Sequence, residues 1–260
     1  MATNGVRMTA VTSSNLETAI AALLPDLLPG RHSKVNCATG FWVSVENPKS
    51  RVQQAHLVTV RHFLEDDGHI RSKVLLRVNR KSGGHSTGPI DLFTSGAGRN
   101  LFLHPDPAVD LAVILVAVAR EGIDWTALPA SALCSQSDLE DAGGARVSFL
   151  GLPGPHTTAR NVPRGGEGEF VAPPRPVLWN GSVMDLLLVR ASPEPGHSGS
   201  PVLRTSDSSL VGVMKGKVTA PASSKDASSP ATIANQAVVV PAYRLHEILF
   251  GEELRTARGF

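Results

Sequence analysis

Cysteine is scarce in this chain of 260 residues. The two cysteines, Cys37 and Cys134, stand far apart in the sequence. So few thiols exclude a small scaffold held together by several disulfides. They favour a reducing compartment, or a core that needs no cross-links.

The first 30 residues lack the order of a secretory signal peptide, in which a charged region, an apolar region and a small-residue cleavage site follow one another. Their apolar stretch is short and is interrupted by Glu17 and Asp26, so it is also unsuited to span a membrane. We therefore expect a cytoplasmic protein that does not bind membranes.

An excess of one charge is absent as well. The formal net charge is +2 and the basic residues are scattered, which argues against a nucleic-acid partner. The densest basic stretch, residues 71–81, alternates with apolar residues as the wet face of a strand does. The nine histidines show no metal-ligand spacing, so we expect no metal and no organic cofactor.

Hydrophobic residues make up 42% of the chain, enough for a substantial core. Near the start, Ser13, Ser14 and Asn15 can cap a helix that carries Leu16, Ile20, Leu23 and Leu24 on one face. This pattern predicts a helical extension within residues 1–34, with the helix ending at Pro25 or at Pro29-Gly30.

After residue 34 the pattern changes to short apolar or alternating runs separated by Gly, Pro, Asn and Asp. Many short strands without strand–helix alternation predict an all-β sandwich or barrel. The runs fall into two groups that divide near residues 120–141, and Leu245, Ile248 and Leu249 predict a second helix over Pro241–Phe250. We expect two β units, at residues 35–120 and 121–260. The candidate strands are Val35–Val45, Ala55–Val60, Lys73–Val78, Asn100–Leu103, Leu111–Val118, Arg146–Leu150, Met184–Arg190, Pro201–Arg204, Leu210–Val218 and Gln236–Val240.

Two stretches have the composition of mobile loops. Ser82–Gly88 is rich in glycine and serine, and Thr219–Ser229 consists almost entirely of Ala, Ser, Pro and Thr.

The segment Gly196-His197-Ser198-Gly199-Ser200-Pro201 has the features that an acyl-transfer nucleophile requires. Glycines on both sides of Ser198 permit a tight turn that aims backbone N–H groups at a developing oxyanion, and the amides of Gly196 and Ser198 are the candidate donors. The same pattern also suits an ordinary turn that leads into a strand.

A serine hydroxyl needs a base, and the base needs a group that fixes its tautomer. His62 ends the apolar run Leu57–Val60, which places it at the end of a strand. Asp110 directly precedes the buried run Leu111–Val116, where a carboxylate is costly without a partner. Its rival Asp106 lies in the turn Pro105-Asp106-Pro107, so we favour Asp110.

The order His62, Asp110, Ser198 resembles the trypsin-like serine peptidase superfamily. The motifs that carry the likeness are Thr59-Val60-Arg61-His62, Asp110-Leu111-Ala112-Val113 and the segment around Ser198, and weaker echoes extend it over about residues 35 to 250. The resemblance implies a chymotrypsin-like pair of six-stranded antiparallel β-barrels. It also implies an endopeptidase in which Ser198 attacks protein or peptide substrates, His62 is the general base and acid, and Asp110 orients His62.

Two departures from the secreted members matter. Secreted members usually have a cysteine just after the catalytic histidine, but none stands just after His62 to pair with Cys37, and no Ile-Val-Gly-Gly-like segment is present for activation by cleavage. The chain is in these respects similar to bacterial or viral members of the superfamily.

Substrate preference stays open. The resemblance puts Ser192 at the floor of the substrate pocket, which disfavours basic side chains, and Met214, Lys215 and Gly216 on its wall. Lys215 would favour acidic substrates and Met214 apolar ones, or the lysines could face solvent. His197, next to the nucleophile, is expected to point away from the reaction.

Two other functions remain to be weighed. One is a protease that is latent until a protein partner activates it, with Thr219–Ser229 or the N-terminal helix blocking the cleft. The other is a protease-fold module that only binds.

Overall fold

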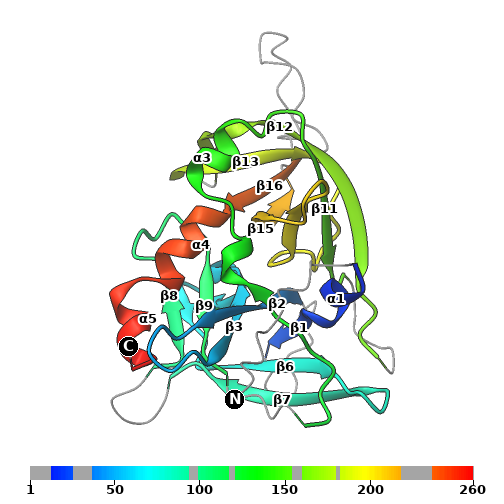
Figure 1. Cartoon of the computed structure of the whole chain (residues 1–260), viewed down its shortest axis with the longest axis vertical. Helices are drawn as coiled ribbons and strands as arrows, with labels where there is room; N and C mark the ends of the chain where they lie inside the picture. Colours follow the sequence, from blue (N-terminus) through cyan, green and yellow to red (C-terminus); the bar gives the residue numbers. More distant parts are fainter. Residues whose placement is uncertain are drawn as a thin grey trace, which may run out of the picture.

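The structure, a computed structural model, describes residues 13–25, 37–93, 99–116, 121–153, 160–179, 182–217 and 236–259. Strands dominate it, and two sheets lie one beyond the other along the longest axis (Figure 1). The predicted all-β class is confirmed. None of the described helices is long and apolar enough to cross a membrane.

The first sheet is open. Its strands run in the order β7-β6-β1-β2-β3-β9-β8, and a short strand, β10, pairs in parallel with β2. Where the resemblance implies a six-stranded barrel, the described residues of this half form a half-barrel of eight strands. The strands are β1 (Ile20–Pro25), β2 (Ala38–Glu46), β3 (Gln53–Thr59), β6 (Lys73–Asn79), β7 (His85–Asp91), β8 (Leu101–Leu103), β9 (Ala112–Ile114) and β10 (Leu128–Pro129).

Of the predicted helical extension within residues 1–34, the described residues 13–25 are only partly helical, which corrects the helix predicted to end at Pro25 or at Pro29-Gly30. Helix α1 spans Ser13–Thr18, and the next residues form the inner strand β1 between β2 and β6. Five of the six residues of β1 are buried. A strand buried on both faces has a continuous apolar run, which sequence periodicity alone does not distinguish from a buried helix.

The second sheet closes into a six-stranded antiparallel barrel, as predicted, in the order β11-β12-β13-β16-β15-β14. Its longest strands are β12 and β13, which pair over Glu169–Trp179 and Ser182–Arg190. The strands are β11 (Arg146–Gly151), β12 (Arg164–Trp179), β13 (Ser182–Arg190), β14 (Pro201–Arg204), β15 (Leu210–Lys217) and β16 (Gln236–Pro241).

Short elements connect and cover the sheets. The predicted C-terminal helix is present as α4, and α5 follows it. Helix α4 contacts β15 and β16 of the barrel and β9 of the open sheet, so it spans the junction between them (Figure 1). The short elements that connect and cover the sheets are α2 (Arg61–Leu64), the small hairpin β4 (Glu65–Asp66) and β5 (His69–Ile70), the 3-10 turn η1 (Ala130–Ala132), α3 (Gln136–Glu140), α4 (Ala242–Leu249) and α5 (Glu252–Ala257).

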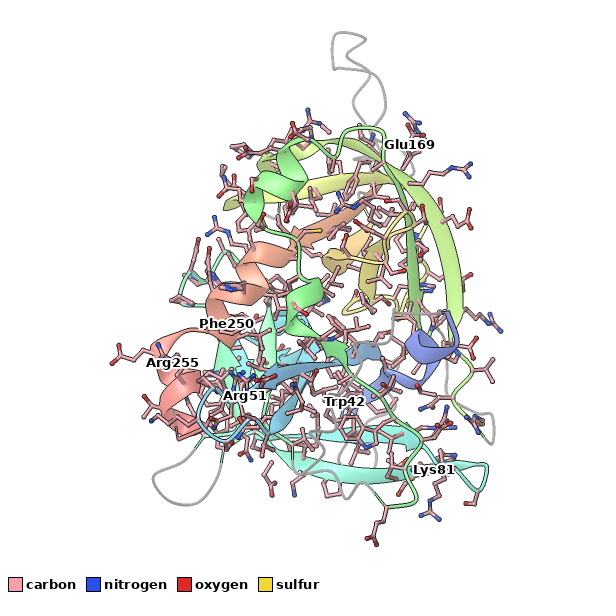
Figure 2. All side chains as sticks on the ribbon, in the orientation of Figure 1. Trp42, Arg51, Lys81, Glu169, Phe250 and Arg255 are labelled. Atoms are coloured by element: carbon pink, nitrogen blue, oxygen red, sulfur yellow. The ribbon has the colours of Figure 1, made fainter. Side chains whose placement is uncertain are left out.

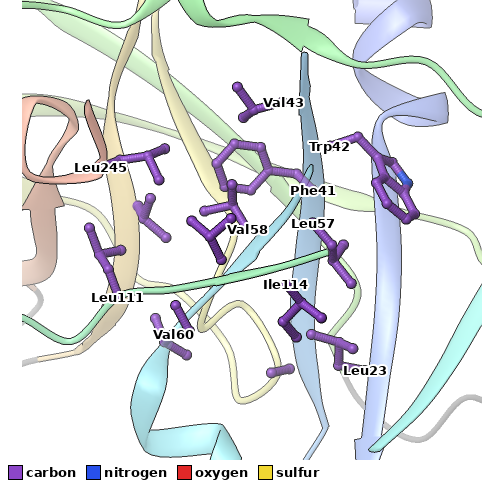
Figure 3. Close-up of a cluster of buried hydrophobic side chains, with 14 of the residues drawn as sticks. Leu23, Phe41, Trp42, Val43, Leu57, Val58, Val60, Leu111, Ile114 and Leu245 are labelled. Carbon is purple, nitrogen blue, oxygen red and sulfur yellow. The ribbon is translucent and has the colours of Figure 1, made fainter. Parts of the chain in front are cut away.

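One apolar core joins the two sheets, and a second core fills the closed barrel. In the shared core, Phe41 and Val58 lie beside Leu111 and Leu245, whereas Trp42 points to the other face of its strand (Figure 3). Successive residues of a strand alternate in this way. The shared core fixes β3 and β9, whose ends carry two of the predicted site residues.

The C-terminus is attached to the open sheet by buried polar contacts. Arg258, which follows α5, donates from Nε to His56 Nε2 on β3 at 2.7 Å and from Nη1 to the Leu249 carbonyl at 2.8 Å. By contrast, charged side chains such as Arg51, Lys81, Glu169 and Arg255 lie on the outside of the molecule (Figure 2).

Of the two loops predicted to be mobile, Ser82–Gly88 forms a turn and then the first residues of β7. Thr219–Ser229 lies outside the described residues.

Candidate active site

His62 lies on the single-turn helix α2, directly after strand β3. Phe63 and Leu64 of the same turn are buried, and they anchor it on the shared core. The His62 side chain stays 48% exposed, so its imidazole is accessible from solvent.

Asp110 holds His62 at two points. One carboxylate oxygen, Oδ1, accepts the backbone N–H of His62 at 2.8 Å, and the other, Oδ2, lies 2.6 Å from the ring Nδ1. An ionised carboxylate only accepts hydrogen bonds, so Nδ1 carries the proton. The other ring nitrogen, Nε2, is then left as the basic one.

Asp110 is itself buried, with 6% of its side chain exposed. Burial by itself would raise the pKa of the Asp110 carboxyl, but the contacts with His62 and with Lys215 outweigh it, and the pKa lies below its usual value. The carboxylate therefore remains ionised at neutral pH.

Ser198 lies on a tight loop between β13 and β14 whose backbone requires glycine. Gly196 and Gly199 have φ of 101° and 89°, in the left-handed region. A Cβ on Gly199 would stand 1.9 Å from the carbonyl oxygen of Thr39, so any side chain there would displace the loop from strand β2.

Thr39, at the start of β2, fastens this loop to the open sheet. Its hydroxyl donates to the Gly196 carbonyl at 2.8 Å and accepts the Leu152 N–H at 2.9 Å, and its backbone N–H donates to the Ser198 carbonyl at 2.8 Å. The carbonyls of Gly196 and Ser198 are thus bound to β2. Within the described part of the chain, the N–H groups of Gly196 and Ser198 have no backbone acceptor.

The Ser198 hydroxyl donates to the carbonyl oxygen of Lys215 on β15 at 3.1 Å. Among the described residues, it makes no hydrogen bond to His62. Catalytic hydrogen bonds are often long or misaligned before substrate binds.

Four residues were predicted to line a substrate pocket, and the structure separates them. Ser192 is exposed and Gly216 is half-buried. Met214 is fully buried in the core of the closed barrel, and Lys215 turns to the other side, where its ammonium lies 2.8 Å from Asp110 Oδ2. The geometry thus favours a role in packing for Met214 and a contact with Asp110 for Lys215.

His197, expected to point away from the reaction, is buried in the loop. Its Nδ1 accepts the Glu194 N–H at 3.0 Å, and its Nε2 lies 3.1 Å from the Arg164 carbonyl. The ring also packs edge-on against Phe149. These contacts suit a residue that holds the loop in shape.

Sequence reasoning missed Thr39 and the contact made by Lys215. A polar residue just before the apolar run Phe41–Val43 is a signal for Thr39, because a buried hydroxyl needs partners. Nothing in the sequence shows which way Lys215 turns. Among the described residues, no three His, Cys, Asp or Glu side chains gather where they could hold a metal ion.

Solved structures share this fold at low sequence identity. The protease domain of MamO from Magnetospirillum magneticum has a TM-score of 0.58 and 14% identity over 90% of this chain and 96% of that one. The Rv3671c protease from M. tuberculosis, in its active form, has a TM-score of 0.54 and 19% identity over 91% of this chain and 81% of that one. The HtrA-type protease AlgW has a TM-score of 0.55 and 15% identity over 92% of this chain and 62% of that one.

No curated protein sequence matches this chain. A family model does match it, that of the trypsin-like peptidase domain, over residues 38–213. This range includes His62, Asp110 and Ser198 and more than half of the chain. The chain belongs to the trypsin-like peptidase family.

Proposed function

We propose that this protein is a serine endopeptidase that cleaves protein or peptide chains through an acyl-enzyme. The observation that carries the proposal is the double contact of Asp110 with His62, at 2.8 and 2.6 Å, together with a glycine-flanked Ser198 on the neighbouring loop. The family match favours a peptidase over a module that only binds.

In the proposed reaction, Ser198 Oγ attacks the carbonyl carbon of the scissile peptide bond, and His62 Nε2 takes the hydroxyl proton. His62 then gives this proton to the leaving amine, so that the C–N bond breaks and an ester to Ser198 remains. Water attacks the ester by the same steps in reverse, and the free serine returns. Asp110 keeps Nδ1 protonated throughout and stabilises the charged imidazole.

The backbone amides of Gly196 and Ser198 are the proposed oxyanion donors. The Gly196 and Ser198 carbonyls are bound to Thr39, and the two N–H groups have no backbone acceptor among the described residues. Preorganised donors of this kind contribute about 3–4 kcal/mol to transition-state stabilisation.

A peptide-cleavage assay tests the proposal. Internally quenched peptides blocked at both ends report endopeptidase action only, since exopeptidases need a free terminus. We expect the wild type to cleave such a library and Ser198→Ala to lose at least about 10³-fold in kcat/KM. Ser200→Ala is the matched control, because Ser200 lies in the same loop and is buried. Equal cleavage by wild type and Ser198→Ala would refute the proposal.

The substrate preference of the wild type is measured next. Mass spectrometry of the cleaved library identifies the residues on each side of the cut bond. Ser192 and Gly216 remain the proposed pocket residues, and a neutral Ser192 predicts no preference for Lys or Arg before the cut. A marked preference for basic residues would contradict this part of the proposal.

A further inference from the structure

The ammonium of Lys215 is buried against the carboxylate that orients His62. Lys215 Nζ donates to Asp110 Oδ2 at 2.8 Å, and the two side chains are 9% and 6% exposed. A buried ammonium is costly without an opposite charge, so this contact is a fixed part of the structure. Lys217, two residues further along β15, is exposed instead.

Lys215 and His62 share one oxygen atom of Asp110. Oδ2 accepts from the His62 ring at 2.6 Å and from Lys215 at 2.8 Å, while Oδ1 accepts the His62 backbone N–H. Among the described residues, His62 on α2 and Lys215 on β15 are the titratable groups whose charge and hydrogen bonds lower the pKa of this carboxyl. The negative charge of Asp110 is therefore shared between an imidazole and an ammonium group.

We propose that Lys215 is a positioning residue that partly neutralises Asp110 and thereby sets the pH range in which His62 can accept a proton. A carboxylate without a second cation strongly favours the charged form of a neighbouring imidazole over its neutral form. An imidazole that is already protonated cannot take the proton of Ser198. With Lys215 present, the charged imidazole faces an ion pair of no net charge. His62 then remains available as a base at lower pH.

This inference rests on the proposed function, because it concerns the base of that reaction. It also adds a link between the two sheets. The open sheet supplies His62 and Asp110, and the closed barrel supplies Lys215 and Ser198. Both ends of Lys215 contact the site, since its carbonyl accepts the Ser198 hydroxyl while its ammonium contacts Asp110.

Four variants separate charge from hydrogen bonding. Lys215→Met removes both, Lys215→Gln keeps a donor without the charge, and Lys215→Arg keeps both. Lys217→Met is the matched control, because it removes an exposed lysine of the same strand. Each variant is measured in two ways: the pH dependence of kcat/KM on a quenched peptide, and the NMR titration of the His62 ring, assigned with His62→Ala.

We expect the acidic midpoint of both curves to rise by about one pH unit in Lys215→Met and Lys215→Gln. Lys215→Arg and Lys217→Met should keep the wild-type midpoint. Unchanged midpoints in folded Lys215→Met would overturn the proposal. A wild-type midpoint in Lys215→Gln would overturn it too, because the hydrogen bond rather than the charge would then be responsible; this variant also decides the matter if Lys215→Met does not fold.

The two readouts distinguish this proposal from the proposed function. The NMR titration needs no catalysis and is repeated in the Ser198→Ala background. An inactive wild type with a raised His62 midpoint in Lys215→Met would refute the peptidase assignment and keep the role of Lys215. An active wild type with midpoints that do not change in the Lys215 variants would keep the peptidase assignment and refute the role of Lys215.

Discussion

The open sheet and the closed barrel contribute to the site in different ways. The open sheet holds His62 and Asp110 by direct side-chain and backbone hydrogen bonds, at the ends of two strands buried in the shared core. The closed barrel presents Ser198 on a loop whose shape depends on glycine and on Thr39 of the other sheet. The base is thus fixed by side-chain contacts and the nucleophile by backbone geometry.

The contribution of the open sheet is tested by removing the charge of Asp110. We expect Asp110→Asn to lower kcat/KM by about 10⁴-fold, because an amide neither stabilises the charged imidazole nor fixes the required tautomer. Asp106→Asn, at an exposed turn, is the control and should stay within about twofold of wild type. If Asp110→Asn kept a tenth of the activity, the open sheet would not supply the orienting group.

The corresponding change in the closed barrel is Gly199→Ala. The added Cβ would meet the Thr39 carbonyl at 1.9 Å in a left-handed backbone, so we expect the free energy of unfolding to fall by at least about 3 kcal/mol. Gly88→Ala is the control, since a Cβ there meets nothing within 4 Å. Equal stability of the two variants in urea denaturation would show that the loop does not need glycine.

We expect acid to destabilise the protein by favouring protonation of His56 in the open sheet. Burial, followed by the charge of Arg258, lowers the pKa of His56 to about 3 from 6.5, despite the hydrogen bond to the Val43 carbonyl. The unfolded chain therefore binds more protons than the native protein between these two pH values. Stability that is present above pH 6.5 is lost as the pH falls towards 3, by up to about 1.4 kcal/mol per pH unit.

We expect His56→Gln to lose stability less steeply than wild type between pH 6.5 and 4.5 in thermal or urea unfolding. His69→Gln is the matched control, because His69 is exposed on β5 and should leave the wild-type slope intact. The same slope in wild type and His56→Gln would mean that His56 does not titrate in this way.

The smallest effect on stability is expected from an exposed ion pair on the closed barrel. Arg190 and Glu169 pair across β13 and β12 at 3.3 Å, with 67% and 49% of their side chains exposed. Exposed pairs contribute little, so Arg190→Ala should change the free energy of unfolding by less than about 0.5 kcal/mol. A loss above about 1 kcal/mol would mean that this exposed ion pair stabilises the barrel more than exposed pairs usually do.

Much of the closed barrel could be predicted from the sequence, and less of the open sheet. The strand at Pro201–Arg204 lies where the short apolar run after the Ser198 segment predicts it. The sequence predicts a helix where the structure has the strand Ile20–Pro25, because burial on both faces removes the periodicity that distinguishes a strand from a helix. The long strand Arg164–Trp179 was missed, because its glycines, prolines and charges have the composition of a loop.

The site shows the same limit. The sequence motifs predict that Asp110 orients His62, and in the structure the two side chains are in contact. The direction of the side chains on β15 depends on strand register, which shifts between Met214 and Gly216. A slip of one residue exchanges the two faces of a strand, so the sequence could not show that Met214 enters the core and Lys215 reaches Asp110.

The most direct test of the central claim is labelling with a fluorophosphonate, which phosphonylates an activated serine with loss of fluoride. Wild type and Ser200→Ala should be labelled at Ser198, and Ser198→Ala and His62→Ala should not be labelled. Labelling that survives Ser198→Ala, or a folded wild type that takes up no label, would contradict the assignment of Ser198 and His62 as nucleophile and base.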